Sequence, residues 1–216
     1  MAAPEIEVLD LLNEPAPSKS PQLGLGSIVL ILGLVMVVAV VGVALTRQNQ
    51  VQPASGPAPT FSLTTFEGQL FDLEAQRGKI VVLNFWGYWC EPCRAEAPLL
   101  QSIYDQYKER GVEVIGVTYI APELDRTMAF LEEFGITYPN GDDLQSKMAE
   151  DYHITGAPET FIIDQNGDIA NVFIGQITEN IQGSMLTVED LTGTLDCLLA
   201  SNGEAAKTCI ESFRLQ

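Results

Sequence analysis

The stretch FWGYWCEPCRAEAP, residues 85–98, places two cysteines, Cys90 and Cys93, on either side of a Glu-Pro pair. It follows the run IVVLNF (80–85), whose β-branched and apolar residues are typical of a buried strand. From residue 92 to 110 the apolar residues recur at helical spacing. The sequence therefore predicts a CxxC motif at the junction between a strand and the start of a helix.

Four kinds of chemistry use cysteines in such a position. A zinc site needs four ligands, normally including a second closely spaced pair. Cys197 and Cys209 are not such a pair and the only histidine is His153, so we expect no metal. A structural disulfide is uncommon at a strand–helix junction with this spacing. A peroxidatic cysteine needs no partner two residues further on. Thiol–disulfide exchange requires both thiols and is the function that the motif favours.

The physical case for exchange rests on the helix start. Cys90 is expected at the N-cap, where free N–H groups and the helix dipole stabilise a thiolate. Cys93, one turn further, can resolve a mixed disulfide. Pro92 suits the first turn, where its missing N–H is not needed.

The other elements predict an α/β domain with a central sheet, helices on both faces and an added N-terminal hairpin. Asn166-Gly167 marks a turn between two late strands, and Thr187 is expected to cap the last helix. The expected elements after the first strand and helix are a strand at 112–118, helices at 125–134 and 144–152, a hairpin at 160–174 and a helix ending near 199.

The N-terminal quarter of the chain predicts a membrane anchor. Residues 25–46 are nearly all apolar and long enough for a helix to cross about 30 Å of hydrocarbon. A cleaved signal peptide is the alternative, but its apolar run is usually only about 7–15 residues long. Flanking charges do not fix the orientation. We expect an acidic disordered tail at 1–24, a flexible linker at 47–59 and one domain at 60–216.

The charge of the chain limits its partners. Its formal net charge is −18, and the four acidic and two basic residues before position 60 leave about −16 for the domain. Such a surface repels nucleic acid and anionic lipid headgroups and favours basic partners.

Two motifs, NFWGYWCEPCRAEAP and TGAPETFIID, resemble the membrane-anchored thioredoxin-like proteins of cytochrome c maturation, the TlpA/DsbE/ResA type. The resemblance covers about residues 60–199. It implies a thioredoxin fold, with a central mixed sheet, held outside the cytoplasm. It also implies Cys90 as nucleophile, Cys93 as resolving thiol and Pro158 as a cis-proline facing them.

The resemblance extends to residues around the cysteines. Glu96 matches an acid of the family pattern, and we expect it to take part in catalysis; the alternative is a solvated helix carboxylate. Asn84 stands where cytoplasmic thioredoxins carry a buried aspartate, and it cannot titrate. Tyr88 replaces a residue that is commonly small. The expected substrate contacts are Tyr88, Trp89, Ala157 and Glu159.

The expected function is that of an extracytoplasmic, membrane-tethered thiol–disulfide oxidoreductase. By resemblance its substrate is the CxxCH disulfide of an apocytochrome c, and a membrane thiol-reducing protein recharges it, with no cofactor of its own. One alternative is a reductase for other cell-envelope disulfides, for example in oxidase copper-site assembly. Another is a non-redox chaperone for cytochrome precursors.

Two further expectations concern the cysteines. Cys197 and Cys209 flank a turn, and in an oxidising compartment such a pair favours a structural disulfide; a buried Cys197 with a free Cys209 is the alternative. Near the motif, Glu91 and Glu96 disfavour the thiolate, and only Arg94 is basic. The pair is therefore expected to be a reductant.

Overall fold

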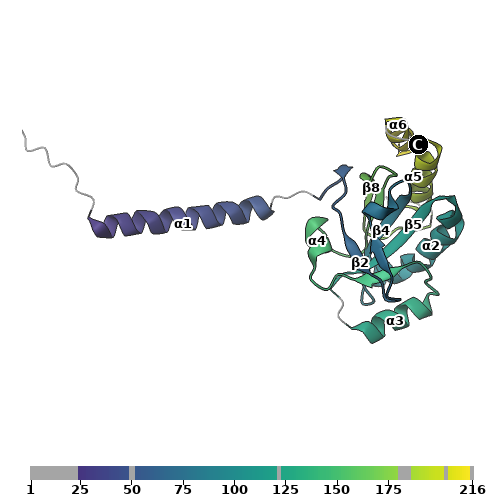
Figure 1. Ribbon diagram of the computed structural model, residues 1–216, viewed down its shortest axis with the longest axis horizontal. Helices are drawn as coiled ribbons and strands as arrows, with labels where there is room; N and C mark the ends of the chain where they lie inside the picture. Colours follow the sequence, from purple (N-terminus) through teal and green to yellow (C-terminus); the bar gives the residue numbers. More distant parts are fainter. Residues whose placement is uncertain (1–23, 49–51, 121–122, 180–185, 202–203, 215–216) are drawn as a thin grey trace, which may run out of the picture. The chain divides into compact units, whose positions relative to one another are not determined.

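The computed structural model describes residues 24–48, 52–120, 123–179, 186–201 and 204–214 (Figure 1). The chain forms two compact units, residues 1–50 and 51–216. In the first, helix α1 (Leu25–Gln48) contains an 18-residue stretch, Gly26–Val43, without a charged residue. This helix is long and apolar enough to be a single-pass membrane anchor. The tail expected at 1–24 lies almost wholly outside the described residues.

The second unit is built on a six-stranded mixed sheet in the order β1-β8-β7-β4-β5-β6. The central strands β4 and β5 run parallel, whereas β4 and β7 run antiparallel. This confirms the thioredoxin-like fold expected from the sequence. The strands of the sheet are β1 (Gly56–Pro57), β4 (Ile80–Trp86), β5 (Val112–Thr118), β6 (Asn140–Asp142), β7 (Glu159–Ile163) and β8 (Asp168–Ile174). The helices are α2 (Glu91–Tyr107), α3 (Leu124–Glu133), α4 (Lys147–Asp151), α5 (Val188–Ala200) and α6 (Glu204–Arg214).

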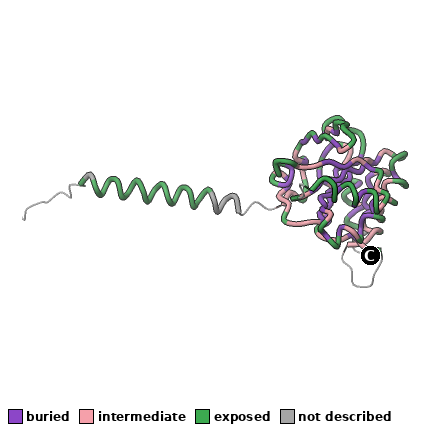
Figure 2. The backbone as a smooth tube through the Cα atoms, turned by 90° about the horizontal axis from the view of Figure 1, so that it is seen from below, coloured by how far each residue is buried: buried purple, intermediate pink, exposed green. Residues whose placement is uncertain are grey.

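Each face of the sheet buries its own apolar layer. Helices α2 and α5 pack on one face, where Leu100 and Leu195 share a cluster with alternate residues of the central strands. Helix α6 packs against α5 and adds Ile210 to this cluster. The other face is covered by a two-stranded hairpin, β2 (Ser62–Thr64) with β3 (Leu70–Asp72), and by α4. Figure 2 shows the buried segments gathered inside this unit. The sheet is thus enclosed, as the continuous burial of its parallel strands requires.

A third apolar cluster lies at the end of the sheet where β4 gives way to α2. Trp86 stacks on Phe130 of α3 with ring centroids 4.6 Å apart, and its indole N–H donates to the Asn140 side chain. Gly116 makes room for this contact, since a Cβ there would come within 1.9 Å of the Asn140 oxygen. The cluster includes both cysteines of the motif, so it supports the site directly.

Three parts of the fold differ from the sequence expectation. The expected linker ends early, because Gly56–Pro57 pairs with β8 and Ala58 is buried. Strand β6 forms where the residues Pro-Asn-Gly-Asp resemble a turn, because it completes the parallel edge beside β5. After α5 the chain forms a further helix, α6, which is not predicted from the sequence. Its Cys209 is joined to Cys197 of α5 by the disulfide that is expected from the sequence.

Candidate active site

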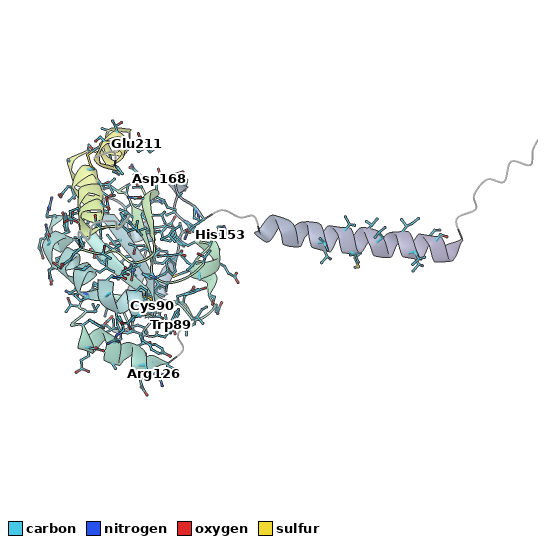
Figure 3. All side chains as sticks on the ribbon, turned by 180° about the vertical axis from the view of Figure 1, so that it is seen from behind. Trp89, Cys90, Arg126, His153, Asp168 and Glu211 are labelled. Carbon is cyan, nitrogen blue, oxygen red and sulfur yellow. A yellow bond between two sulfur atoms is a disulfide. The ribbon has the colours of Figure 1, made fainter. Side chains whose placement is uncertain are left out.

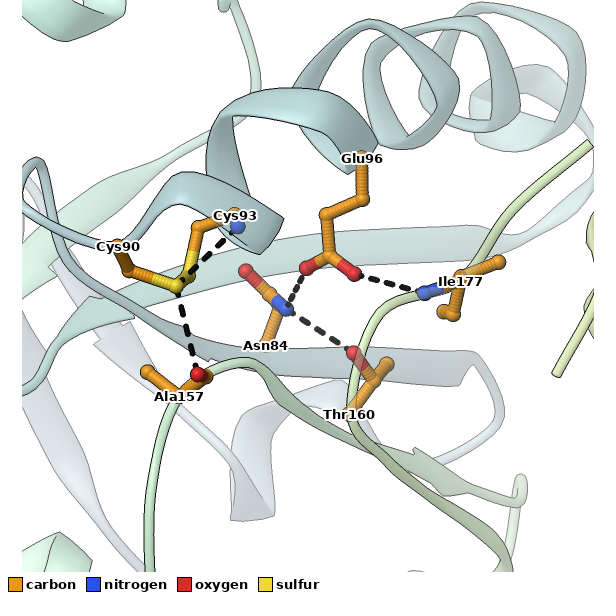
Figure 4. Close-up of a disulfide and its surroundings, with 7 residues drawn as sticks. All are labelled: Asn84, Cys90, Cys93, Glu96, Ala157, Thr160 and Ile177. Carbon is orange, nitrogen blue, oxygen red and sulfur yellow. Dashed lines mark hydrogen bonds between the residues drawn. A yellow bond between two sulfur atoms is a disulfide. The ribbon is translucent and has the colours of Figure 1, made fainter.

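Cys90 and Cys93 form a disulfide at the N-terminus of α2, with an S–S distance of 2.06 Å (Figure 4). Cys90 is the N-cap of the helix, and the backbone N–H of Cys93 donates to its Sγ at 3.1 Å. The two residues are only 3% and 2% exposed. A thiolate at Cys90 would therefore receive a backbone hydrogen bond and the favourable end of the helix dipole.

The loop before β7 faces the cysteine pair. The Ala157–Pro158 peptide bond is cis, and the Ala157 carbonyl oxygen lies 3.3 Å from the Sγ of Cys90. Pro158 is buried, and its carbonyl accepts a hydrogen bond of 2.9 Å from the Gly175 N–H. The structure thus brings residues 67 positions apart in sequence into direct contact at the reactive sulfur.

Glu96 lies one turn along α2 from Cys93 and is 1% exposed. Its carboxylate accepts hydrogen bonds from the Asn84 side chain at 3.0 Å and from the Ile177 N–H at 3.1 Å. Burial raises the pKa of Glu96 from its ordinary value of 4.5 to about 7, while the bonds from Ile177 and Asn84 act in the opposite direction. The structure therefore contradicts the alternative of a solvated carboxylate.

Glu159, the residue after Pro158, is also 1% exposed. Its Oε1 accepts hydrogen bonds from the Thr155 N–H, the Thr155 hydroxyl and the Gly156 N–H, at 3.0, 2.8 and 3.1 Å. The Glu159 side chain therefore fixes the residues that precede the cis-proline, Thr155 and Gly156, from inside the domain. This corrects the expectation of a direct substrate contact, because the carboxylate does not reach the surface.

Trp89 and Tyr88 flank the motif on its outer side. Trp89 is 50% exposed and lies beside Cys90 at the end of the domain that carries α3 (Figure 3). A Cβ on Gly87 would approach the Trp89 ring to 2.8 Å, so glycine permits its position. The Tyr88 hydroxyl donates to Glu123 at 2.8 Å, which ties the motif to the start of α3. Trp89 thus offers the open apolar surface, while the hydroxyl of Tyr88 is already engaged.

Arg94, the basic residue next to Cys93 in sequence, is directed to α3. It forms an ion pair with Glu133, and its guanidinium lies 4.9 Å from the centroid of the Phe134 ring. Its charge is therefore partly neutralised by a partner other than the cysteines. Among the described residues, no group of three or more histidine, cysteine or acidic side chains is arranged to hold a metal ion.

Comparison with known proteins decides the family. The family model for AhpC/TSA proteins matches residues 54–172. The chain belongs to the AhpC/TSA family. It is 40% identical over 122 residues to the thiol-disulfide oxidoreductase ResA of Geobacillus kaustophilus, covering 56% of this chain and 70% of that protein. ResA of Oceanobacillus iheyensis is 36% identical over 159 residues, with 70% and 80% covered.

Solved structures agree with this assignment. A Chlorobium tepidum protein described as a thiol:disulfide interchange protein DsbE matches with a TM-score of 0.60 and 26% identity, covering 69% of this chain and 99% of that one. StoA from Bacillus subtilis matches with a TM-score of 0.50 and 28% identity over 56% and 90% of the two chains. This AhpC/TSA family member is thus a thiol–disulfide oxidoreductase of the ResA type, with its cysteine pair in a CxxC arrangement.

Two residues of this ResA-type site were not expected from the sequence. The backbone N–H of Ile177, 81 positions away in sequence, donates a hydrogen bond to Glu96. Every residue except proline has such an N–H, so the residue type does not indicate this contact. Thr160 accepts a hydrogen bond of 3.0 Å from the Asn84 amide. The motif TGAPETFIID places Thr160 close to the site in sequence. Its hydrogen bond with Asn84, however, depends on the pairing of these two residues across β4 and β7, which the motif does not indicate.

Proposed function

We propose that this ResA-type protein reduces the CxxCH disulfide of an apocytochrome c outside the cytoplasm, with Cys90 as nucleophile and Cys93 as resolving thiol. The observation that carries the proposal is the placement of the Cys90 sulfur between a helix N-terminus and the Ala157 carbonyl of a cis-proline loop. The names of the relatives support thiol–disulfide exchange as the reaction class. The substrate itself is part of the proposal.

In the first step the Cys90 thiolate attacks one sulfur of the substrate disulfide. A bond forms between that sulfur and the Cys90 Sγ, the substrate S–S bond breaks, and the second substrate sulfur leaves as a thiolate that takes up a proton. The Cys93 N–H, which already points at the Cys90 Sγ, stabilises the attacking charge.

In the second step Cys93 loses its proton and attacks the Cys90 sulfur of the mixed disulfide. The internal disulfide forms and the substrate departs as a dithiol carrying both electrons. Glu96, one turn from Cys93 and with a pKa raised to about 7 by its burial, is suited to accept the Cys93 proton at neutral pH. A membrane thiol-reducing protein then returns two electrons to the pair.

The cis-proline loop would hold the substrate during both steps. An extended peptide can add to exposed backbone groups beside a reactive centre, and the Ala157 carbonyl faces the Cys90 sulfur. Trp89 offers an apolar surface next to the same sulfur. The acidic surface of the domain favours a basic protein as partner.

Trapping tests the substrate assignment. The full-length Cys93→Ser variant, reduced and then mixed with a disulfide-bonded CxxCH peptide, should accumulate a mixed disulfide at Cys90 that mass spectrometry locates. The Cys90→Ser variant is the matched control and should trap nothing. A peptide with the histidine replaced by alanine measures whether the haem-attachment motif matters. Equal trapping of any disulfide peptide would replace the cytochrome assignment by a general envelope reductase.

Labelling tests the location. If α1 anchors the domain outside the cytoplasm, Cys90 of intact cells should react with a membrane-impermeant thiol reagent after mild external reduction. Reaction seen only after lysis would place the domain in the cytoplasm and would contradict the proposed reduction of apocytochrome c outside it.

A further inference from the structure

The first described residues of the folded unit, 52–59, form a strap along the edge of the sheet. At one end Gly56–Pro57 pairs with Ile169 and Asp168, at the start of β8. At the other end the Gln52 side chain donates a hydrogen bond to Oε2 of Glu159, at the start of β7. Since β7 and β8 are antiparallel, the strap extends from the cis-proline end of the sheet to the opposite end. Figure 3 labels Cys90 and Asp168 toward these two ends.

The strap is fixed to the domain at several points. The Ala58 N–H donates to the Gly167 carbonyl at 3.0 Å, and the Tyr152 hydroxyl donates to the Pro59 carbonyl at 2.7 Å. Ala58 is buried in the same apolar layer as Tyr152. These contacts hold the strap whether or not Gln52 is present, so Gln52 can be replaced without releasing the segment.

Glu159 connects the strap to the reactive sulfur. Its Oε1 gathers the Thr155 and Gly156 N–H groups, and its Oε2 accepts from Gln52. A buried carboxylate whose oxygens are both hydrogen-bonded has a fixed orientation, and removing one partner removes part of what orients it. The loop that Glu159 holds carries Ala157, whose carbonyl lies 3.3 Å from the Cys90 Sγ.

We infer that Gln52 is a positioning residue for thiol–disulfide exchange. It acts through Glu159 on the cis-proline loop, so the segment that follows the anchor in sequence sets how well the loop receives a peptide substrate. The inference rests on the proposed role of the loop in holding the substrate. Gln52, which lies in the linker that the sequence predicts at 47–59, thereby takes part in the reaction.

The test compares two disulfides that differ in their need for the loop. Hydroxyethyl disulfide has no peptide backbone and needs only the Cys90 thiolate, whereas the disulfide-bonded CxxCH peptide also needs the loop. In full-length protein in detergent, Gln52→Ala should lower the second-order rate constant for the peptide by about three- to tenfold. The rate constant for hydroxyethyl disulfide should change by less than about twofold. Ser55→Ala, an exposed position in the same strap, is the matched control and should leave both rates unchanged.

A double-mutant cycle tests the route through Glu159. In a Glu159→Ala background, which leaves no side-chain group to accept a hydrogen bond from Gln52, Gln52→Ala should lower the peptide rate by less than about twofold. An equal effect in both backgrounds would overturn the inference. So would a Gln52→Ala protein whose peptide rate matches the wild type, or one in which both probes slow equally.

Hydrogen exchange separates this inference from the proposed function. The Gly156 amide, held by Glu159, should exchange faster in Gln52→Ala than in Ser55→Ala. If the wild-type protein does not reduce the CxxCH peptide, the proposed substrate fails, and the Gly156 exchange then decides the inference. Unchanged exchange at Gly156 would overturn the role of Gln52 even if the wild-type protein reduces the peptide.

Discussion

The side-chain amide of Asn84 donates a hydrogen bond of 3.0 Å to the carboxylate of Glu96, at a depth where Asn84 and Glu96 are each only 1% exposed. The same amide nitrogen donates to the Thr160 hydroxyl (Figure 4). Asparagine supplies a donor here without adding a second charge. Glu96 is therefore the ionisable member of this buried hydrogen-bonded group.

The stability of the oxidised protein should depend on pH through Glu96. Its pKa is raised from 4.5 to about 7 in the folded state by burial. The unfolded chain therefore releases this proton first, and stability falls as pH rises from about 4.5 through 7. A shift of this size corresponds to a loss on the order of 3 kcal/mol.

Urea denaturation of wild type and Glu96→Gln at pH 5 and pH 8 measures this effect. The difference in unfolding free energy, wild type minus variant, should fall by about 2–3 kcal/mol between the two pH values, because most of the shift lies in this range. A difference that stays constant with pH would show that the Glu96 carboxyl titrates normally.

Replacing Asn84 by aspartate should set two carboxylates against each other. Like charges at hydrogen-bond distance disfavour double ionisation, so Asn84→Asp should raise the pKa of Glu96 further and make the two groups titrate as a pair. We expect a greater loss of stability at pH 8 than at pH 5. Asn84→Ala, which removes the donor without adding a charge, is the control, and an equal loss for Asp and Ala at pH 8 would contradict the expected repulsion.

How far the sequence predicts this protein can be judged from individual residues. The strand at 80–86, the helix start at Cys90 and the hairpin around Gly167 follow from local periodicity and turn chemistry, because the determining residues are neighbours. The burial of Glu96 does not, since one of its hydrogen-bond partners, Ile177, lies 81 positions away, and the other, Asn84, is paired with Thr160 across β4 and β7. Composition predicts too long a linker, because proline and glycine at 56–57 are typical of a flexible segment, whereas β8 offers these two residues an edge with which they pair.

The disulfide between Cys197 and Cys209 should stabilise the C-terminal part of the domain. It joins α5 to α6 over a sequence separation of 12, and closing such a loop is worth about 3 kcal/mol in the chain-entropy model. Cys197→Ala combined with Cys209→Ser should lose about this much unfolding free energy. Peptide mapping of the wild type without reduction should find the two cysteines linked; separately alkylated peptides would contradict the pairing.

The effect of Glu96 on the redox potential should also depend on pH. A negative charge near the cysteines disfavours the thiolate and shifts the balance toward the disulfide. Glu96→Gln should therefore make the midpoint potential less negative at pH 8, where the Glu96 carboxyl is mostly ionised. At pH 5.5, where it is mostly protonated, the two potentials should agree. A shift of equal size at both pH values would mean that the charge of Glu96 is not the cause.

The midpoint potential of the wild-type pair is the most direct test of the central claim, that Cys90 and Cys93 reduce substrate disulfides. Glu91 lies beside the nucleophile, Glu96 lies one turn beyond Cys93, and Arg94 is engaged with Glu133. Equilibration of the full-length protein with thiol buffers of known potential at pH 7 should give a midpoint nearer to ~−270 mV, as for thioredoxin, than to ~−120 mV. A midpoint near the oxidising end would contradict the assignment of a reductase.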